Sequence, residues 1–259
     1  MVQALDEEHA KQLGLEKEAV DELGERYDDL IDFFILLALN QRISRQRKLQ
    51  IASKKMAQYR AFNSAFSERT GRKAYELGKN QAYREVGAKI QAMSGAQEKE
   101  LSALIGQLNA DLDSRLGVYE NNFKKLTYKV DLANLREESL GFTSATEQRY
   151  FNDGRSKKKE ILFADSKGRR ISNKAIMSVG AGDILWDTME SGKRTVYLSL
   201  GITEVEHISV IDDRTTEICL SLHRKRRDLR KDKIPPMHRG CRSKIRAIDP
   251  TTGKPFTRK

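Results

Sequence analysis

Apolar residues recur at intervals of three and four between residues 15 and 134, which is the spacing of one face of an α-helix. Good helix formers dominate this stretch, and no proline occurs before residue 235. The pattern predicts three or four long helices, arranged as an antiparallel bundle or an extended arm, with breaks at Thr70-Gly71 and at residues 93–96. The clearest stripes are Leu23, Tyr27, Leu30, Ile31, Phe34 and Leu37, and later Leu101, Leu104, Ile105, Leu108, Leu112 and Leu116.

The run 33–39 is apolar on every helical face. Such a helix is usually buried at the centre of a bundle, and the alternative is a docking surface for another subunit. The run is far shorter than the ~20 residues that a membrane span needs. The acidic start, residues 1–9, lacks the apolar core of a signal peptide. We therefore expect no membrane association.

The long helical pattern of apolar residues gives way to shorter, mixed patterns near residue 140. Residues 161–172 resemble a hairpin with its turn at 165–168, and 174–200 predict one or two helices interrupted at 180–182. A strand at 205–211, a short helix at 215–222 and a last strand at 243–248 follow, with Asp213 or Thr215 as the expected N-cap. The expected fold class is α+β: a long all-helical region over 1–140, followed by a small α+β domain over 141–259.

Composition narrows the choice of partners. The chain has 259 residues, of which 38% are hydrophobic and 33% charged, and its net charge is +11. These values favour an elongated or helical architecture and polyanionic partners, such as nucleic acid or an acidic protein surface. Simple solubility is the alternative reading of the charge. Two cysteines do not make a disulfide framework, which favours a soluble protein of a reducing cytosol.

Both cysteines lie near histidines in the pattern C-x3-H-x14-H-x2-C, formed by Cys219, His223, His238 and Cys241. Cys219 and His223 would share one face of a helix. Two such pairs, brought together by a loop, suit the tetrahedral N/S ligands of zinc. Two alternatives stay open: a buried Cys219 with a hydrogen-bonded His238, and a disulfide, against which the reducing compartment argues.

The basic stretch between the two pairs could neutralise phosphates of DNA, or it could be a solvated loop. It lacks the aromatic residues that would stack on single strands. Its candidate nucleic-acid-binding residues are Arg224, Lys225, Arg226, Arg227, Arg230 and Lys231.

The sequence gives less support to a catalytic function than to a metal site. No partner that would orient a Cys-His pair is visible, and an HNH-like nuclease would need more than the two remaining histidines, His9 and His207. We expect His9, in a polar terminus, to be solvated. Glu204 and Glu206 have the spacing of the Glu-x-Glu turn of ADP-ribosyltransferases, although acidic residues on one strand face explain it more simply. No catalytic residue is assigned.

The elements of the tail, taken together, resemble the C-terminal signature of the phage Mu F-like minor head proteins, the head morphogenesis family of tailed phages. The matching residues are Asp212-Asp213-Arg214-Thr215, then Cys219, then Pro235-Pro236-x-His238-x-x-Cys241-Arg242-Ser243. Thr216 stands where many members have a cysteine, and His223-Arg224 where many have Asp-Gly. We expect His223 to supply a fourth ligand.

The resemblance implies a structural protein of the virion interior, present in few copies. It would associate with the portal protein and other head or capsid proteins and act in head assembly, or in DNA packaging and ejection. It would pass through the host cytoplasm during assembly, and the basic loop would meet packaged double-stranded DNA or an acidic neighbour. No enzymatic activity follows from the motif.

Within the motif we expect Asp213 to cap the short helix and Arg214 to pair with a carboxylate. Thr215, Pro236 and Arg242 complete it. His238 and Cys241 would hold the tail against the short helix. The main alternative function is a zinc-stabilised DNA-binding module that works outside a virion, and a more distant one is a nuclease or ADP-ribosyltransferase.

Overall fold

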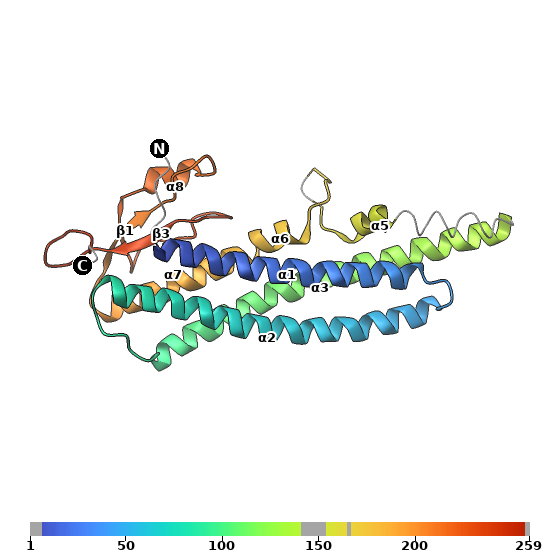
Figure 1. The fold of residues 1–259 in the computed structure, drawn as a ribbon, viewed down its shortest axis with the longest axis horizontal. Coiled ribbons are helices and arrows are strands. Elements are labelled where there is room, and N and C mark those ends of the chain that lie inside the picture. The colour runs from blue at the N-terminus through green and yellow to red at the C-terminus, as the bar shows by residue number, and fades with distance from the viewer. Residues whose placement is uncertain (1–6, 141–153, 165–166, 257–259) are drawn as a thin grey trace. The chain divides into compact units, whose positions relative to one another are not determined.

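A computed structural model describes residues 7–140, 154–164 and 167–256 (Figure 1). Long helices come first, and a small antiparallel sheet with further helices follows, which confirms the α+β fold class. Within the described residues no helix is long and apolar enough to cross a membrane. The elements are α1 Glu7–Leu39, α2 Arg45–Glu85, α3 Gly95–Leu140, α5 Gly154–Ile161, α6 Asn173–Val179, α7 Ala181–Ser199, β1 Glu204–Ile208, α8 Glu217–Leu222, β2 Arg226–Asp228 and β3 Lys244–Ala247.

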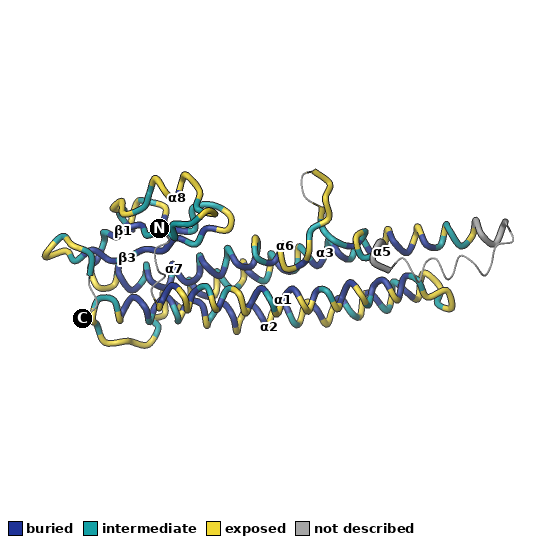
Figure 2. The backbone as a smooth tube through the Cα atoms, turned by 45° about the horizontal axis from the view of Figure 1, so that its top comes forward, coloured by how far each residue is buried: buried dark blue, intermediate teal, exposed yellow. Residues whose placement is uncertain are grey.

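The long helices follow the apolar stripes of the sequence. Leu23, Tyr27 and Leu30 of α1 are fully buried, and buried and exposed positions alternate along α1 and α2 (Figure 2). The expected break at 93–96 is confirmed, because α3 begins there. The break expected at Thr70-Gly71 is wrong, because α2 runs through it. A Cβ on Gly71 would lie 2.8 Å from Cγ1 of Ile105, so this glycine makes room for α3.

The apolar run 33–39 forms the end of α1. Phe34, Ile35, Leu37 and Ala38 are buried, as expected of a central helix, whereas Leu36 is 63% exposed. Burial therefore accounts for most of the run, and its use as a docking surface stays a prediction.

The chain divides into two compact units, and each takes residues from all three long helices. Unit 1 comprises Met1–Val20, Phe66–Asn109 and Ser178–Lys259, and unit 2 comprises Asp21–Ala65 and Ala110–Met177. This division does not follow the boundary at residue 140 that the sequence indicated. In unit 1 the C-terminal residues form one body with the first turns of α1 and the last turns of α2.

Unit 2 is held together by buried side chains of α1, α2 and α3. The hydroxyl of Tyr27 donates to Oδ1 of Asn63 at 3.0 Å, and the ring of Phe34 stacks on Phe123 with centroids 4.5 Å apart. The hairpin expected at 161–172 is present in part, as an antiparallel bridge between Ala164 and Arg170. Its turn residues 165–166 and the expected junction at 141–146 lie outside the described residues.

The sheet of unit 1 has the strand order β2-β1-β3, with both pairings antiparallel. The strands expected at 205–211 and 243–248 are present as β1 and β3, although β1 ends at Ile208, three residues before the expected end. The region 174–200 forms two helices separated at Gly180. Strand β2 was not expected from the sequence. The core between the sheet and the helices contains Ala82, Tyr83, Val196, Tyr197, Ile202, Val205, Leu229, Ile234, Ile245 and Ala247.

Two glycines let α2 and α7 approach closely in unit 1. A Cβ on Gly78 would lie 1.8 Å from the carbonyl oxygen of Met189, and one on Gly192 would lie 2.4 Å from that of Tyr75. Because real Cβ atoms do not tolerate such distances, any larger residue would force the two backbones apart. The glycines therefore fix how near α7 lies to α2.

Two carboxylates, those of the half-buried Glu85 and the buried Glu190, bind the edge of β3 that faces away from β1. Oε1 of Glu85 accepts the backbone N–H of Ala247 at 2.7 Å, and Oε2 of Glu190 accepts that of Ile245 at 2.8 Å. Burial raises the pKa of Glu85, while the nearby Lys193 opposes that rise. The strand that follows Cys241 is thus attached to α2 and α7 through its own backbone.

Candidate metal centre

Cys219 is positioned by the start of α8. Thr216 is the N-cap, and its hydroxyl accepts the N–H of Cys219 at 3.4 Å. At the other side the hydroxyl of Ser209, just after β1, donates to the carbonyl of Cys219 at 2.7 Å. The prediction of Asp213 or Thr215 as the N-cap is wrong, because the chain makes a turn at these residues and the helix begins only after Thr216.

His238 and Cys241 lie on the loop that follows the proline pair. Pro235 is buried and Pro236 half-buried. Gly240 has a φ of 70°, a left-handed conformation that suits glycine, and its N–H donates to Oδ1 of Asp183 at 2.7 Å. The N–H of Cys241 donates to the carbonyl of His238 at 3.1 Å. This tight turn brings the imidazole and the thiol to the same side of the loop.

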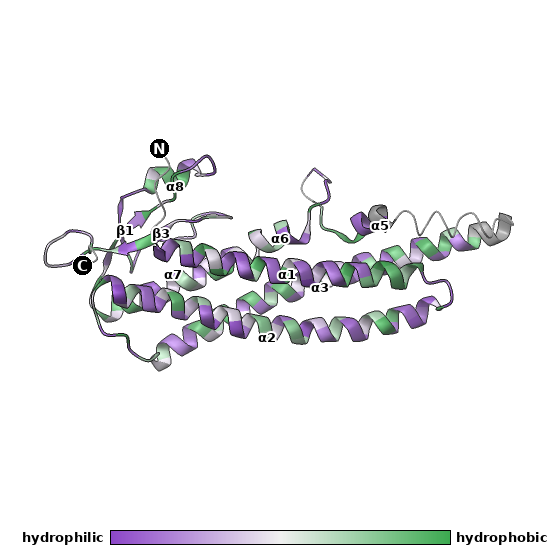
Figure 3. Ribbon diagram, viewed as in Figure 1, coloured by the Kyte–Doolittle hydropathy of each residue, from purple (hydrophilic) through white to green (hydrophobic). Residues whose placement is uncertain are grey.

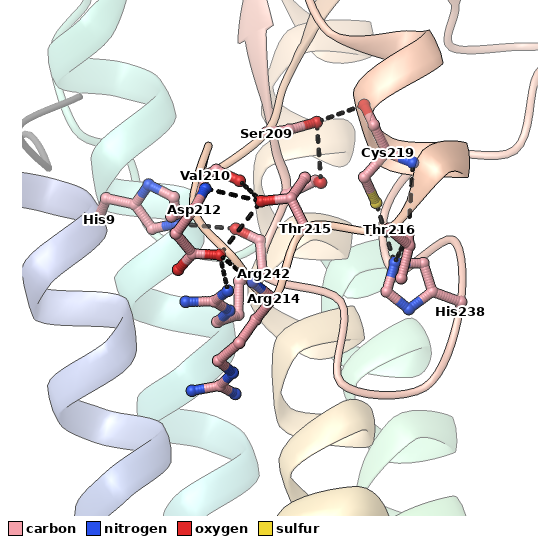
Figure 4. Close-up of polar contacts among 11 residues, drawn as sticks. His9, Ser209, Val210, Asp212, Arg214, Thr215, Thr216, Cys219, His238 and Arg242 are labelled. Carbon is pink, nitrogen blue, oxygen red and sulfur yellow. Dashed lines mark hydrogen bonds and ion pairs between the residues drawn. The ribbon is translucent and has the colours of Figure 1, made fainter. Parts of the chain in front are cut away.

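The side chains of Cys219, His238 and Cys241 meet at α8. Figure 4 shows Cys219 and His238 pointing toward one another. Sγ of Cys219 lies 3.6 Å from Sγ of Cys241 and 3.0 Å from Nε2 of His238. All three potential ligand atoms lie within 4.8 Å of one another. With Zn–S bonds of ~2.3 Å, the sulfur atoms of a tetrahedral site are ~3.7 Å apart. The group is therefore close enough to hold a metal ion.

The hydrogen bonding of His238 suits a ligand. Its Nδ1 lies 2.9 Å from the carbonyl oxygen of Arg239, which can only accept, so the proton is on Nδ1 and the lone pair is on Nε2. An imidazole oriented through its other nitrogen is the usual arrangement around protein-bound metals. Nε2 also lies 2.8 Å from the hydroxyl of Thr216.

The protein environment disfavours a free thiolate at Cys219. Both cysteines are buried, with 3% of each exposed. Burial raises the pKa of the Cys219 thiol, and the adjacent Cys241 adds to the rise. Because a metal binds the thiolate, uptake of an ion at this site would release protons.

His223 does not belong to this group. Helix α8 ends at Leu222, so His223 is its C-cap and leaves the helical face on which Cys219 lies. Its Nδ1 instead accepts the backbone N–H of Ser209 at 3.1 Å. The expectation that His223 supplies a fourth ligand therefore fails, because the helix is one residue too short.

The acidic part of the motif forms a compact turn beside the cluster (Figure 4). The hydroxyl of Thr215 accepts the N–H of Asp212 at 2.9 Å and donates to the carbonyl of Val210. Asp212 pairs with Arg242 at 2.8 Å, and this hydrogen-bonded pairing lowers the pKa of Asp212 to about 2. The ion pair with a carboxylate that was expected of Arg214 is therefore made by Arg242 instead. Arg214 itself is exposed.

Three further residues support the site without any signal in the sequence. His9, expected to be solvated, is buried, and its Nε2 donates to the carbonyl of Arg242 at 2.8 Å. Its ring lies against Trp186, whose Nε1 donates to the carbonyl of Ser243 at 2.6 Å. Together with Asp183, these contacts hold both ends of the Cys241 turn. Only the packing of α1 and α7 in unit 1 reveals them.

The basic stretch forms β2 and a turn, and several of its charges are balanced locally. Arg226 pairs with Glu204 at 3.1 Å, Arg230 with Asp228 at 3.2 Å, and Arg227 lies 3.7 Å from Asp232. Arg224 and Lys225 are exposed just before β2, and Arg224 has a φ of 60°. DNA binding by this stretch, including Lys231, stays a prediction.

The acidic residues of β1 take part in cross-strand pairs. Glu204 accepts from Nη1 of Arg226, its diagonal neighbour on β2, at 3.1 Å, and Glu206 accepts from Nε of Arg246 of β3 at 3.1 Å. These contacts give both carboxylates a role in joining the strands.

Comparison of the chain with protein-family models, with curated proteins and with solved structures gave no match.

Proposed function

We propose that the chain is a minor head protein of a tailed phage, associated with the portal and other head proteins inside the virion and acting in head assembly and DNA packaging or ejection. The supporting observation is that the residues carrying the family resemblance converge. Cys219 and Cys241 are 22 positions apart in the chain, and their sulfur atoms lie 3.6 Å apart. Asp212 and Arg242 of the same motif form an ion pair beside them.

This convergence supports the resemblance, because the residues of a motif that stabilises one small region must lie close together in the folded protein. The turn at Thr215, the helix α8 and the loop after Pro236 each contribute a side chain to it. In the proposed role, the long helices dock on the portal. The contacts among the motif residues keep the C-terminal part of unit 1 folded.

Particle composition tests this proposal. Particles from a lysate would be separated from free protein on a density gradient and analysed by quantitative mass spectrometry. The chain should co-sediment with DNA-filled heads, at a copy number near that of the portal protein and far below that of the major capsid protein. A chain found only among the free proteins would refute the proposal.

We further propose that Cys219, His238 and Cys241 bind zinc, with the fourth position filled from outside this group. Two thiolates and one imidazole form a ligand set that zinc favours. The ion would tie α8 to the loop after Pro236, a structural role.

Elemental analysis of the purified chain tests the zinc proposal. About one zinc ion per chain is expected, and Cys241→Ser should abolish binding. His223→Ala is the matched control, because this histidine lies nearby but outside the group, and it should retain the metal. A folded, metal-free wild type in zinc-containing buffer would show that the site is held by packing alone.

A further inference from the structure

A long segment of the helical region carries basic residues and no acidic ones. No Asp or Glu occurs between Asp32 and Glu68, so the end of α1 and the N-terminal half of α2 lack negative side chains. This basic segment of the helical region is distinct from the basic stretch around β2. Its basic residues are Arg42, Arg45, Arg47, Lys48, Lys54, Lys55 and Arg60.

Some of these charges are already used within unit 2. Lys48 is buried, and its Nζ donates to the carbonyl of Ala38 at 2.7 Å. Arg45 lies 4.0 Å from Asp131 on α3, and Arg60 lies 3.5 Å from Glu120. Such residues help to hold the helices of the unit together.

Three others are exposed: Arg42, Arg47 and Lys54. The guanidinium of Arg47 donates from Nη1 to Oε1 of Gln50 at 3.1 Å, which is an uncharged partner. Among the described residues, no carboxylate lies within ion-pair distance of any of the three. We define them as the α2 cationic face.

The geometry of this face suits a row of phosphates. Arg47 and Lys54 are seven residues apart, so they lie on the same side of α2, about 10 Å apart along its axis. Arg42 precedes the helix in the turn after α1. Exposed polar side chains at Gln50 and Ser53 lie in the same stretch, and hydrophilic positions recur along this half of α2 (Figure 3).

The surroundings of the face argue for duplex DNA. Within residues 40–67, which carry the face, no described residue has a large exposed hydrophobic side chain, and beside this stretch Leu36 of α1 and Tyr128 of α3 are exposed as single side chains. Protein interfaces, by contrast, usually centre on a cluster of apolar or aromatic anchors. Tyr59 and Phe66 are buried, and so unavailable for stacking on unpaired bases. A cationic face without such anchors fits the phosphate backbone.

We infer that the α2 cationic face binds the backbone of double-stranded DNA without sequence preference. This inference does not depend on the proposed function, because it concerns the free protein and free DNA. It also places the principal contact in unit 2 rather than at β2, where Arg226 and Arg230 pair with carboxylates.

Binding of the full chain to a short fluorescent duplex, measured by anisotropy over a range of salt concentrations, tests the inference. The variant R42Q/R47Q/K54Q removes the α2 cationic face. Its matched control is R69Q/R72Q/K73Q, which removes the same charge from the same helix. Arg72 and Lys73 already pair with Glu98 and Glu18.

The first variant should bind at least tenfold more weakly at low salt. The slope of log affinity against log salt should fall by about 2.7, from three phosphate contacts at ~0.9 each. The control should keep most of the affinity. The inference is overturned if the control loses as much, if R226Q/R227Q/R230Q alone abolishes binding, or if the wild type does not bind the duplex. Equal competition by polyglutamate at matched charge would assign the face to acidic proteins instead.

Discussion

Glu190 of α7 joins three segments of unit 1, and Glu190→Ala tests how firmly β3 is held. Oε1 accepts from Nζ of Lys193 at 2.7 Å and from Nε2 of Gln12 at 3.0 Å. Oε2 accepts from the backbone of Ile245 at 2.8 Å. The side chain of Glu190 is 0% exposed and that of Lys193 is 3% exposed. The pair is thus desolvated, and every part of the carboxylate is used.

Removing this carboxylate breaks the ion pair of a buried ammonium, whose remaining nearby carboxylate, Glu85, lies outside ion-pair distance. Breaking a buried pair in this way costs about 3–5 kcal/mol. The freed N–H of Ile245 would account for about 1–3 kcal/mol of the loss. Glu204→Ala provides the control, because Glu204 and Arg226 are 46% and 53% exposed. Its expected cost is below about 1 kcal/mol.

Urea unfolding followed by tryptophan fluorescence measures the difference. Trp186 is the only tryptophan of the chain, and it is buried on α7 within unit 1. The midpoint should fall strongly for Glu190→Ala, and the double variant E190L/K193M should recover much of the loss, because it removes both charges. If Glu190→Ala costs no more than Glu204→Ala, the carboxylate does not hold the strand as argued.

Two further predictions concern unit 1. Gly78→Ala should lower the stability by about 3 kcal/mol or more, because its Cβ would overlap the backbone of α7. Gly106→Ala, with no atom within 4 Å, should instead raise it by about 0.5–1 kcal/mol in the same urea assay. Burial lowers the pKa of His207 to about 4, so the folded state keeps this ring neutral. The stability from this shift should be fully present above about pH 6.5, the pKa of an unfolded histidine, and decline as the pH falls towards 4. His207→Gln should flatten that decline, and an unchanged slope would assign it to other groups.

The helices could be predicted from the sequence because their apolar stripes are long and regular. Strand β2 could not, because Arg226-Arg227-Asp228 lacks the apolar alternation of a half-buried strand. It forms because β1 offers a paired backbone and Glu204 offers a counter-charge. Gly71 is the opposite case: it lies inside α2 and allows close packing against Ile105, but in the sequence it cannot be distinguished from a glycine that ends a helix.

Some residues of the candidate site could likewise be predicted from the sequence, and others could not. Cys219, His238 and Cys241 could be selected from spacing, because two short-range pairs separated by a loop are a local feature. His223 failed for a local reason that only the helix end reveals. His9 could not have been found, because its contact with Arg242 spans 233 positions and depends on how α1 packs in unit 1.

The packing of unit 1 implies that the C-terminal residues are not an independent domain. The core beneath the sheet includes Ala82 and Tyr83 of α2, and the backbone of β3 donates to Glu85 of the same helix. A fragment beginning near residue 141 would lack these partners and the bond from His9. It would therefore expose apolar surface and leave buried polar groups unpaired, which costs several kcal/mol. Metal binding measured on such a fragment would report on a partly unfolded chain, so experiments on Cys219 and Cys241 require the full protein.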